Sequence, residues 1–154
     1  MPVPEDILVK IEKYCSYQER CEGETREKLR SYGLGNVDID DIIDRLISDR
    51  FINDERFTEN YIRSKLNLKK WGKIKIGYHL SLKKIDSAII SKYLHAIPEE
   101  EYRVILDENI RQWCKINPYN QNTKPKLYRY LKGKGFENEM IINQLKQLHD
   151  DEQN

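Results

Sequence analysis

The sequence lacks an excess of charge of either sign and any long apolar run. Twenty-seven basic residues stand against 26 acidic ones, a formal net charge of +1. Coating nucleic acid by bulk attraction requires many cations with little opposing charge, so the balance argues against this mode of binding and leaves room only for local basic patches. A run of about 18 apolar residues, as a membrane helix needs, is missing. The start, MPVPEDILVK, has neither the basic region nor the apolar stretch of a secretory signal. We therefore expect a cytoplasmic protein.

Cysteine is scarce and does not form a motif. The three cysteines are Cys15, Cys21 and Cys114. Their number is odd, and no C-x-x-C pair is present, as a zinc or redox site would use. Combining Cys15 and Cys21 with a histidine (His79, His95 or His149) fits no metal-ligand spacing. We expect buried or idle thiols, and neither a metal nor a cofactor.

Catalytic motifs are missing as well. The sequence has no phosphate loop of the P-loop type, no H-E-x-x-H and no nucleophile motif. Three acids, Glu99 to Glu101, follow Pro98 and lie near His95. Adjacent carboxylates at a helix start usually complement the helix dipole and do not act as general acids. We expect that the protein is not an enzyme.

What the sequence does contain is an internal repeat. Three decapeptides align without gaps: VDIDDIIDRL, IDSAIISKYL and FENEMIINQL. They begin at positions 37, 85 and 136, so their spacing is nearly constant. An apolar residue opens each one, and apolar residues return at the sixth and tenth places, on one face of a helix. The aligned residues are Val37, Ile85 and Phe136, then Ile42, Ile90 and Ile141, then Leu46, Leu94 and Leu145.

Two further helices precede each decapeptide. KIGYHLSLKKI aligns with KLYRYLKGKGF, so that Leu80 matches Leu131. Leu29 takes this place in the first copy if three extra residues surround Gly33 and Gly35. A longer periodic stretch comes before this pair, and Asp54 is a suitable N-cap for the one that begins near Phe57. Nothing in the sequence is typical of a β-strand.

These patterns predict an all-α chain of three tandem three-helix repeats. Such units are too small to bury their apolar faces alone, so neighbours should stack. The predicted boundaries are 1–53 for the first repeat, 54–97 for the second and 98–149 for the third, with an acidic tail at 150–154.

Charge is ordered along the repeats. No acidic residue occurs from Asn60 to Ile85, or again from Asn109 to Phe136. Stacked repeats would turn these basic runs into a stripe that faces DNA phosphates or an acidic protein groove, and charge alone does not distinguish the two. The alternative is a solvated lysine face that binds nothing specific. The candidate partner-binding residues are Arg63, Lys65, Lys69, Lys70, Trp71, Lys73, Lys75, Lys83, Lys84, Lys124, Lys126, Arg129, Lys132 and Lys134.

Trp71 and Gly72 lie between two expected helices within the first basic run. A tryptophan in this place could stack on a base or anchor a partner. More often it closes the helix joint as a core residue, which is the interpretation we favour.

The stretch from Asp54 to Leu94 resembles the central repeat of the RecX family, regulators of the RecA recombinase. The pattern is an acid pair before an aromatic-led helix, a Trp-Gly joint after basic residues, and a short turn into an Ile-rich helix. The matching residues are Asp54, Glu55, Phe57, Tyr61, Trp71, Gly72, Lys75, Ile76, Leu80, Ile85, Ile90 and Leu94. Lys70 and Lys84 depart from it, because the family often has glycine there, and this leaves the backbone at both places open.

The resemblance implies an elongated, curved array that binds in the groove of the RecA filament on single-stranded DNA. We expect the protein to be a monomer. It would hinder the recombinase, ATPase and coprotease activities of RecA in DNA repair and the SOS response. Weak direct binding to DNA is compatible with the same charges. One alternative is a helix-turn-helix protein built from IGYHLSLKKIDSAIISKYL, although the stretch from Ile85 to Leu94 offers few base-reading side chains. Another is a helical-repeat scaffold for a different protein.

Overall fold

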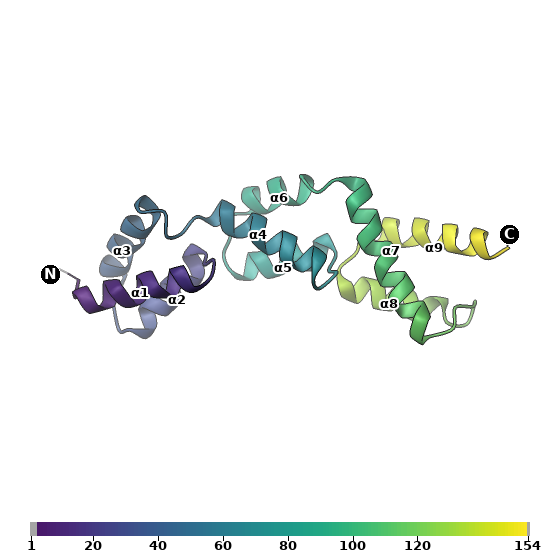
Figure 1. Ribbon diagram of the computed structural model, residues 1–154, viewed down its shortest axis with the longest axis horizontal. Coiled ribbons are helices and arrows are strands. Elements are labelled where there is room, and N and C mark those ends of the chain that lie inside the picture. Colours follow the sequence, from purple (N-terminus) through teal and green to yellow (C-terminus); the bar gives the residue numbers. More distant parts are fainter. Residues whose placement is uncertain (1–2, 154) are drawn as a thin grey trace. The chain divides into compact units, whose positions relative to one another are not determined.

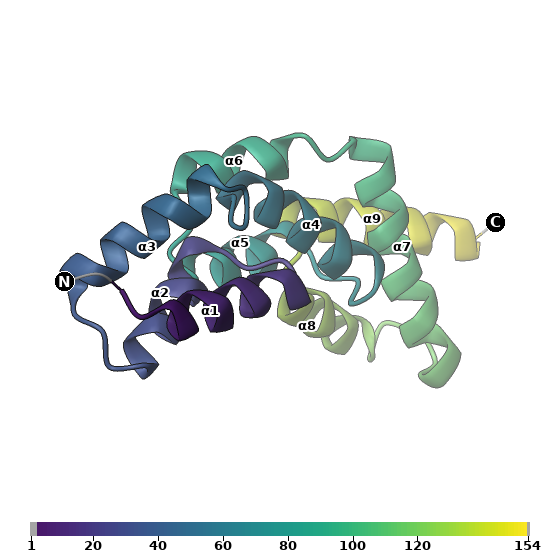
Figure 2. The ribbon, with the colours of Figure 1, turned by 60° about the vertical axis from the view of Figure 1, so that its left-hand side comes forward.

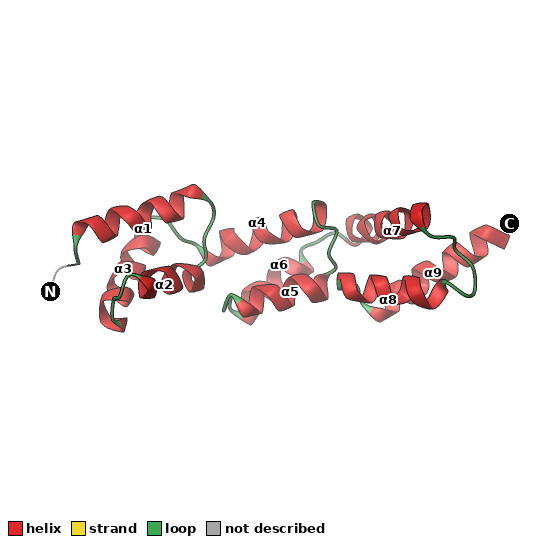
Figure 3. Ribbon diagram, turned by 90° about the horizontal axis from the view of Figure 1, so that it is seen from below, coloured by secondary structure: helices red, strands yellow, loops and turns green. Residues whose placement is uncertain are grey.

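The computed structural model describes residues 3–153, and side chains up to residue 149. The predicted acidic tail at 150–154 lies outside the described side chains. Within the described residues the chain forms nine α-helices and no strand (Figures 1 and 3). The helices are α1 (Glu5–Tyr17), α2 (Glu22–Ser31), α3 (Asn36–Ser48), α4 (Asp54–Asn67), α5 (Lys73–Leu82), α6 (Ser87–His95), α7 (Glu99–Ile116), α8 (Lys124–Lys134) and α9 (Asn138–Gln153).

The second and third helices of the repeats recur at one constant spacing. The second helices, α2, α5 and α8, begin at positions 22, 73 and 124. The third helices, α3, α6 and α9, begin at positions 36, 87 and 138, which are separated by the same interval. The prediction of an all-α chain of tandem three-helix repeats is therefore confirmed.

The turn between the second and third helices has the same backbone in each repeat. Gly33, Lys84 and Gly135, which follow the same constant spacing, have φ angles of 85°, 64° and 98°. The residue in the left-handed conformation ends the preceding helix, and glycine adopts this conformation without a steric cost. Lys84 keeps the conformation at a cost of roughly 1–2 kcal/mol. The backbone at Lys84, which the sequence alone does not determine, thus has the same left-handed conformation as the glycine in the turns of the other two repeats. Lys70, the other departure, is also left-handed, with a φ of 57°.

The predicted register of the first repeat is wrong by three residues. Val37, which we aligned with Ile85 and Phe136, is 75% exposed, whereas those two are buried. At the observed spacing Leu34 takes that place, and it packs partly buried against the core. No extra residues surround Gly33, since the turns 32–35 and 83–86 have equal length.

The error arises because α3 is apolar enough to fit two registers. Ile42 and Leu46 are four residues apart, and so are Ile39 and Ile43, and all four are buried. Apolar periodicity alone does not choose between these pairs. The structural alignment pairs Ile39 with Ile90 and Ile141.

By contact density the chain divides into two compact units. Unit 1 consists of the residues up to Tyr61 together with Leu80–Ile90, and unit 2 consists of Ile62–His79 and the residues from Ser91 onward. The middle repeat therefore contributes to both units. The repeat boundaries proposed above follow the helix pattern and not this division.

Each unit has its own core. In unit 1, α2 packs against α1 and α3 (Figure 2). The cluster there comprises Ile11, Cys15, Leu29, Ile39, Ile42, Ile43, Leu46 and Ile52. In unit 2, α8 packs against α7 and α9, and the rings of Tyr102 and Phe136 lie 5.5 Å apart in the interior. Both are almost fully buried.

Some features are missing from the described part of the chain. None of its helices has both the length and the apolar character needed to cross a bilayer. It likewise holds no group of three His, Cys, Asp or Glu side chains placed to bind a metal ion. Cys15 and Cys21 are buried, as predicted, and Cys114 is partly exposed.

Candidate partner-binding surface

Each unit contains one joint between two repeats. Joint 1, in unit 1, is where residues 21–24 at the start of α2 meet Lys83 and Lys84 after α5. Joint 2, in unit 2, is where residues 72–75 at the start of α5 meet residues 133–136 at the end of α8 and in the turn that follows it. The two sets of residues occupy equivalent places in successive repeats.

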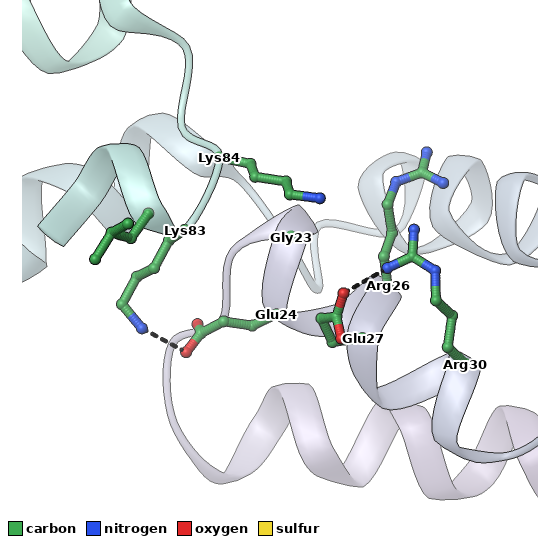
Figure 4. A pocket seen from close by; sticks show the side chains of 8 residues that line it. Gly23, Glu24, Arg26, Glu27, Arg30, Lys83 and Lys84 are labelled. Carbon is green, nitrogen blue, oxygen red and sulfur yellow. Dashed lines mark hydrogen bonds and ion pairs between the residues drawn. The ribbon is translucent and has the colours of Figure 1, made fainter.

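Joint 1 is closed by an ion pair. Lys83 Nζ lies 3.0 Å from Glu24 Oε2, and Figure 4 shows Lys83 reaching toward this carboxylate while Lys84 points away from it. Burial alone would lower the pKa of Lys83, but its hydrogen bond and charge attraction with Glu24 outweigh burial and raise it. A Cβ on Gly23 would overlap the Lys83 carbonyl, so the two segments touch through their backbones.

A buried thiol caps α2 at this joint. The Glu24 amide donates to Cys21 Sγ at 3.5 Å, and the thiol lies 3.9 Å from the Lys83 carbonyl. Burial raises the pKa of Cys21 to about 12, which keeps the thiol neutral at physiological pH. Asp54 accepts a hydrogen bond from the Glu22 amide at 2.8 Å. The predicted N-cap role of Asp54 is wrong: the Asn53 side chain accepts from the Arg56 amide instead.

Joint 2 uses the same backbone contact with two added hydrogen bonds. The Gly72 amide donates to the Lys134 carbonyl at 2.8 Å, and the Ile74 amide donates to the Gly135 carbonyl at 2.9 Å. A Cβ on Gly72 would overlap the Gly135 backbone, and one on Gly135 would overlap Lys75. Glycine is therefore required on both sides of the contact.

Buried polar side chains of α7 hold joint 2 in place. The Tyr102 hydroxyl accepts from the Lys73 amide at 2.9 Å and donates to Glu137. Burial, followed by the hydrogen bond to Glu137, raises the pKa of Tyr102. Asn109 donates to the Lys70 carbonyl at 2.9 Å. Beyond an apolar helix face, nothing in the sequence indicates these contacts.

The charged side chains within residues 72–75 and 133–136 are all basic, and the first carboxylate after them, that of Glu137, accepts from Tyr102. Lys75 occupies the place of Glu24, and Lys134 occupies the place of Lys83. Lys134 Nζ donates to the Lys69 carbonyl at 3.1 Å, and Lys75 Nζ donates to the Gly133 carbonyl at 3.5 Å. Burial, and then the charges of Lys75 and Lys69, lower the pKa of Lys134.

Trp71 lies beside joint 2 and is partly buried. Its ring is 4.8 Å from that of His79, and the ammonium groups of Lys65 and Lys75 lie 5.0 and 4.6 Å from its centre. Its amide donates to the Lys65 carbonyl at 3.0 Å. These contacts favour the interpretation of Trp71 as a joint residue over that of a base-stacking platform.

A basic groove of about 680 Å³ lies in unit 2. It is lined by Leu68, Lys69, Lys70, Glu108, Asn109, Arg111, Gln112, Lys115, Tyr130 and Lys134. Three of these, Lys69, Lys70 and Lys134, belong to the predicted set. Two of the lining cations form ion pairs: Lys70 with Glu108 at 2.5 Å, and Arg111 with Asp107 at 2.9 Å.

The remaining predicted residues lie apart from the groove lining. Lys126, Arg129 and Lys132 are exposed along α8, on the side away from its buried leucines, and Lys124 is partly buried at the helix start. Arg63 is exposed on α4, and the Lys73 ammonium lies 4.6 Å from the Tyr102 ring centre. In unit 1, Lys83 and Lys84 line a smaller hollow of about 230 Å³ with Arg26 and Arg30 (Figure 4).

Comparison with known proteins gives consistent matches. Residues 10–46 match the model for "RecX, first three-helix domain", and residues 53–94 match that for "RecX, second three-helix domain". The regulatory protein RecX of Bacillus mycoides is 31% identical over 146 residues, which are 91% of this chain and 54% of the relative. That of Clostridium tetani is 35% identical over 135 residues, covering 85% and 60%. The chain thus spans little more than half the length of these relatives.

Solved structures agree in fold. The crystal structure of RecX from Lactobacillus salivarius superposes with a TM-score of 0.79 at 27% identity, covering 95% of this chain and 99% of that one. A second crystal structure, of a regulatory protein RecX, gives a TM-score of 0.74 at 21% identity and supports the fold alone.

Proposed function

Since the chain belongs to the RecX family, we propose that it regulates the RecA recombinase by binding the RecA filament on single-stranded DNA. Its relatives are named regulatory proteins, in agreement with the prediction that it is not an enzyme. By occupying the filament groove, the protein would hinder filament growth, strand exchange, ATP hydrolysis and RecA-promoted repressor cleavage. Its action in the cytoplasm and as a monomer is part of this proposal.

One observation carries the proposal beyond family membership. Twelve of the 14 predicted partner-binding residues lie in unit 2, and only Lys83 and Lys84 lie in unit 1. The exposed cations of α8, Lys126, Arg129 and Lys132, are free of the packing roles that Lys73 and Lys75 have at joint 2. A filament of protein and DNA presents phosphates and carboxylates, and a concentrated basic surface is attracted to both.

The test is a titration of the full chain into RecA that is hydrolysing ATP on single-stranded DNA. We expect the ATPase rate to fall at substoichiometric to near-stoichiometric amounts of the protein. An unchanged rate across the titration would contradict the proposal.

The basic surface is tested with two sets of charge reversals. Lys126→Glu, Arg129→Glu and Lys132→Glu together should weaken inhibition by about tenfold, because loss of charge at an interface slows association. The second set is Lys69→Glu, Lys70→Glu, Lys73→Glu and Lys75→Glu, at and beside joint 2, and it should also weaken inhibition if the contact includes this region. Circular dichroism checks that both variants remain helical. If both fold and inhibit normally, the contact lies elsewhere.

A further inference from the structure

Joint 2 and the basic groove together hold more positive charge than the surrounding described residues neutralise. Three carboxylates are described there: Asp107 and Glu108 are paired with Arg111 and Lys70, and Glu137 accepts from the Tyr102 hydroxyl. The other cations are Lys69, Lys73, Lys75, Lys115 and Lys134. Lys134 and Lys75 are both partly buried, and each ammonium is held against a backbone carbonyl, that of Lys134 at 3.1 Å from the Lys69 carbonyl.

Joint 1 shows how the same geometry is closed elsewhere in this chain. There the third residue of the helix, Glu24, supplies a carboxylate to Lys83. At joint 2 the third residue is Lys75, so the position that should provide the negative charge adds a positive one. The lowered pKa of Lys134 agrees with this reading. An anion from outside the chain would remove the repulsion.

We propose that a phosphate group binds in the unit 2 groove against Lys69 and Lys134, and closes joint 2 as Glu24 closes joint 1. Lys75, whose charge acts on Lys134, and Lys115, in the groove lining, add positive charge to this site. The proposal concerns this chain alone and does not depend on RecA.

The side chains favour phosphate over carboxylate. An arginine fork suits the planar carboxylate, but the one arginine in the groove lining, Arg111, is already paired with Asp107. Lysine ammonium groups act as point charges and suit a tetrahedral anion of higher charge. A volume of about 680 Å³ also has room for a nucleotide or a short length of nucleic-acid backbone. The two sources share the same phosphate chemistry.

Binding should stabilise the hydrogen bonds that cross joint 2. The Gly72 and Ile74 amides donate to carbonyls at Lys134 and Gly135. When the joint opens, these amides exchange with solvent, and a ligand that binds only the closed joint reduces the open population.

The experiment is hydrogen exchange of the full chain, resolved at Gly72 and Ile74, in inorganic pyrophosphate and in sodium chloride of equal ionic strength. At free pyrophosphate about nine times its Kd, exchange should be about tenfold slower than in chloride. Equal rates in the two salts would overturn the proposal. A slowing that persists in Lys69→Gln and in Lys134→Gln would overturn it too. Lys69 is exposed, so its variant is expected to fold.

A charge reversal provides the sharpest variant. Lys75→Glu should recreate the ion pair of joint 1, so that the two amides exchange slowly without pyrophosphate and respond to it little. The matched control is Lys126→Glu, at the third position of α8, because it has the same charge change and the same helix-dipole effect at an exposed site. This control should respond to pyrophosphate as the unaltered chain does. An identical response from both variants would count against the proposal.

Further ligands separate the sources of phosphate. If ATP slows amide exchange at Gly72 and Ile74 and this effect depends on Lys69, the ligand is a free nucleotide. If a thymidine oligonucleotide slows this exchange, the ligand is a nucleic-acid backbone. A glutamate-rich peptide that slows exchange as strongly as pyrophosphate would contradict the preference for phosphate.

Discussion

Joints 1 and 2 share their backbone contact and differ in their charges. In both, the start of a second helix lies against the left-handed turn of the next repeat, with glycine where the chains touch. Joint 1 adds an attraction between Glu24 and Lys83, whereas joint 2 places Lys75 near Lys134. The backbone contact is thus the constant element of the repeat. The charged side chains differ between the two joints, and the lysines at joint 2 attract anions.

The shared backbone contact should be the most sensitive part of the comparison. Gly72→Ala places a methyl group into the Gly135 backbone and should reduce the free energy of unfolding by about 3 kcal/mol, measured by denaturant unfolding. Gly133→Ala is the control: its Cβ would meet nothing within 4 Å, and alanine favours the helix, so stability should rise by roughly 0.5–1 kcal/mol. A Gly72→Ala variant as stable as the original chain would show that the contact is not close.

Joint 1 has one counterpart of the polar support at joint 2: Asp54 accepts from the Glu22 amide, which is equivalent to the Lys73 amide that donates to Tyr102. Tyr102→Phe leaves the Lys73 amide and the Glu137 carboxylate without their buried partner, and should cost about 1–3 kcal/mol. Amide exchange should accelerate at Gly72 and Ile74 and stay unchanged at Thr25, beside joint 1. Acceleration at both joints would mean that the loss is global and that Tyr102 has no local role.

A substitution at joint 1 can also remove the charge difference between the two joints. Glu24→Lys gives joint 1 the charges of joint 2, and should destabilise unit 1 by about 1 kcal/mol, because a partly exposed pair is replaced by two like charges. Glu24→Gln separates the loss of attraction from the gain of repulsion. Denaturant unfolding ranks the three proteins, and we expect the glutamine variant between the other two. Equal stability of all three proteins would show that the charge at position 24 does not contribute to the stability of joint 1.

Alkaline pH should affect the two joints in opposite directions, with the smallest effects. The pKa of Lys134 is lowered on folding, so the unfolded chain binds more protons and stability from this group rises as pH approaches the ordinary lysine value. The pKa of Lys83 is raised, so its contribution is present below the ordinary value and is lost as pH climbs through the folded pKa. Exchange-corrected protection at each joint from about pH 9 to pH 11 measures both trends. Trends of the same sign would contradict the comparison.

The sequence predicted the repeat because a helix that packs on its neighbours must repeat its apolar spacing. It did not predict the register of the first copy, since the four buried apolar residues of α3 fit two different alignments with the other repeats. Nor could it predict the joints. Glu24 and Lys83 are far apart in the sequence and meet only when two repeats stack, so local composition could not reveal their ion pair. The lysine was therefore assigned to partner binding.

The site was predicted in the same partial way. Basic residues near Trp71 and Gly72 marked joint 2 because local composition is visible in a sequence. Arg111 and Lys115, on α7, also line the groove; they fall within the acid-free stretch from Asn109 to Phe136 but are not among the predicted residues. Asn109 was missed because its role, to hold the Lys70 carbonyl, exists only once α7 has packed.

Because joint 1 lies before joint 2 in the sequence, the residues of joint 1 are synthesised first. Joint 1 needs the chain only as far as Lys84, whereas joint 2 needs it as far as Gly135. A ribosome that adds roughly 5–20 residues per second therefore releases the parts of joint 1 some seconds before those of joint 2. During that interval the start of α5, with Trp71, Gly72 and Lys75, has no following turn to meet. All residues of unit 1 are thus available while the third repeat, which completes unit 2, is still being made.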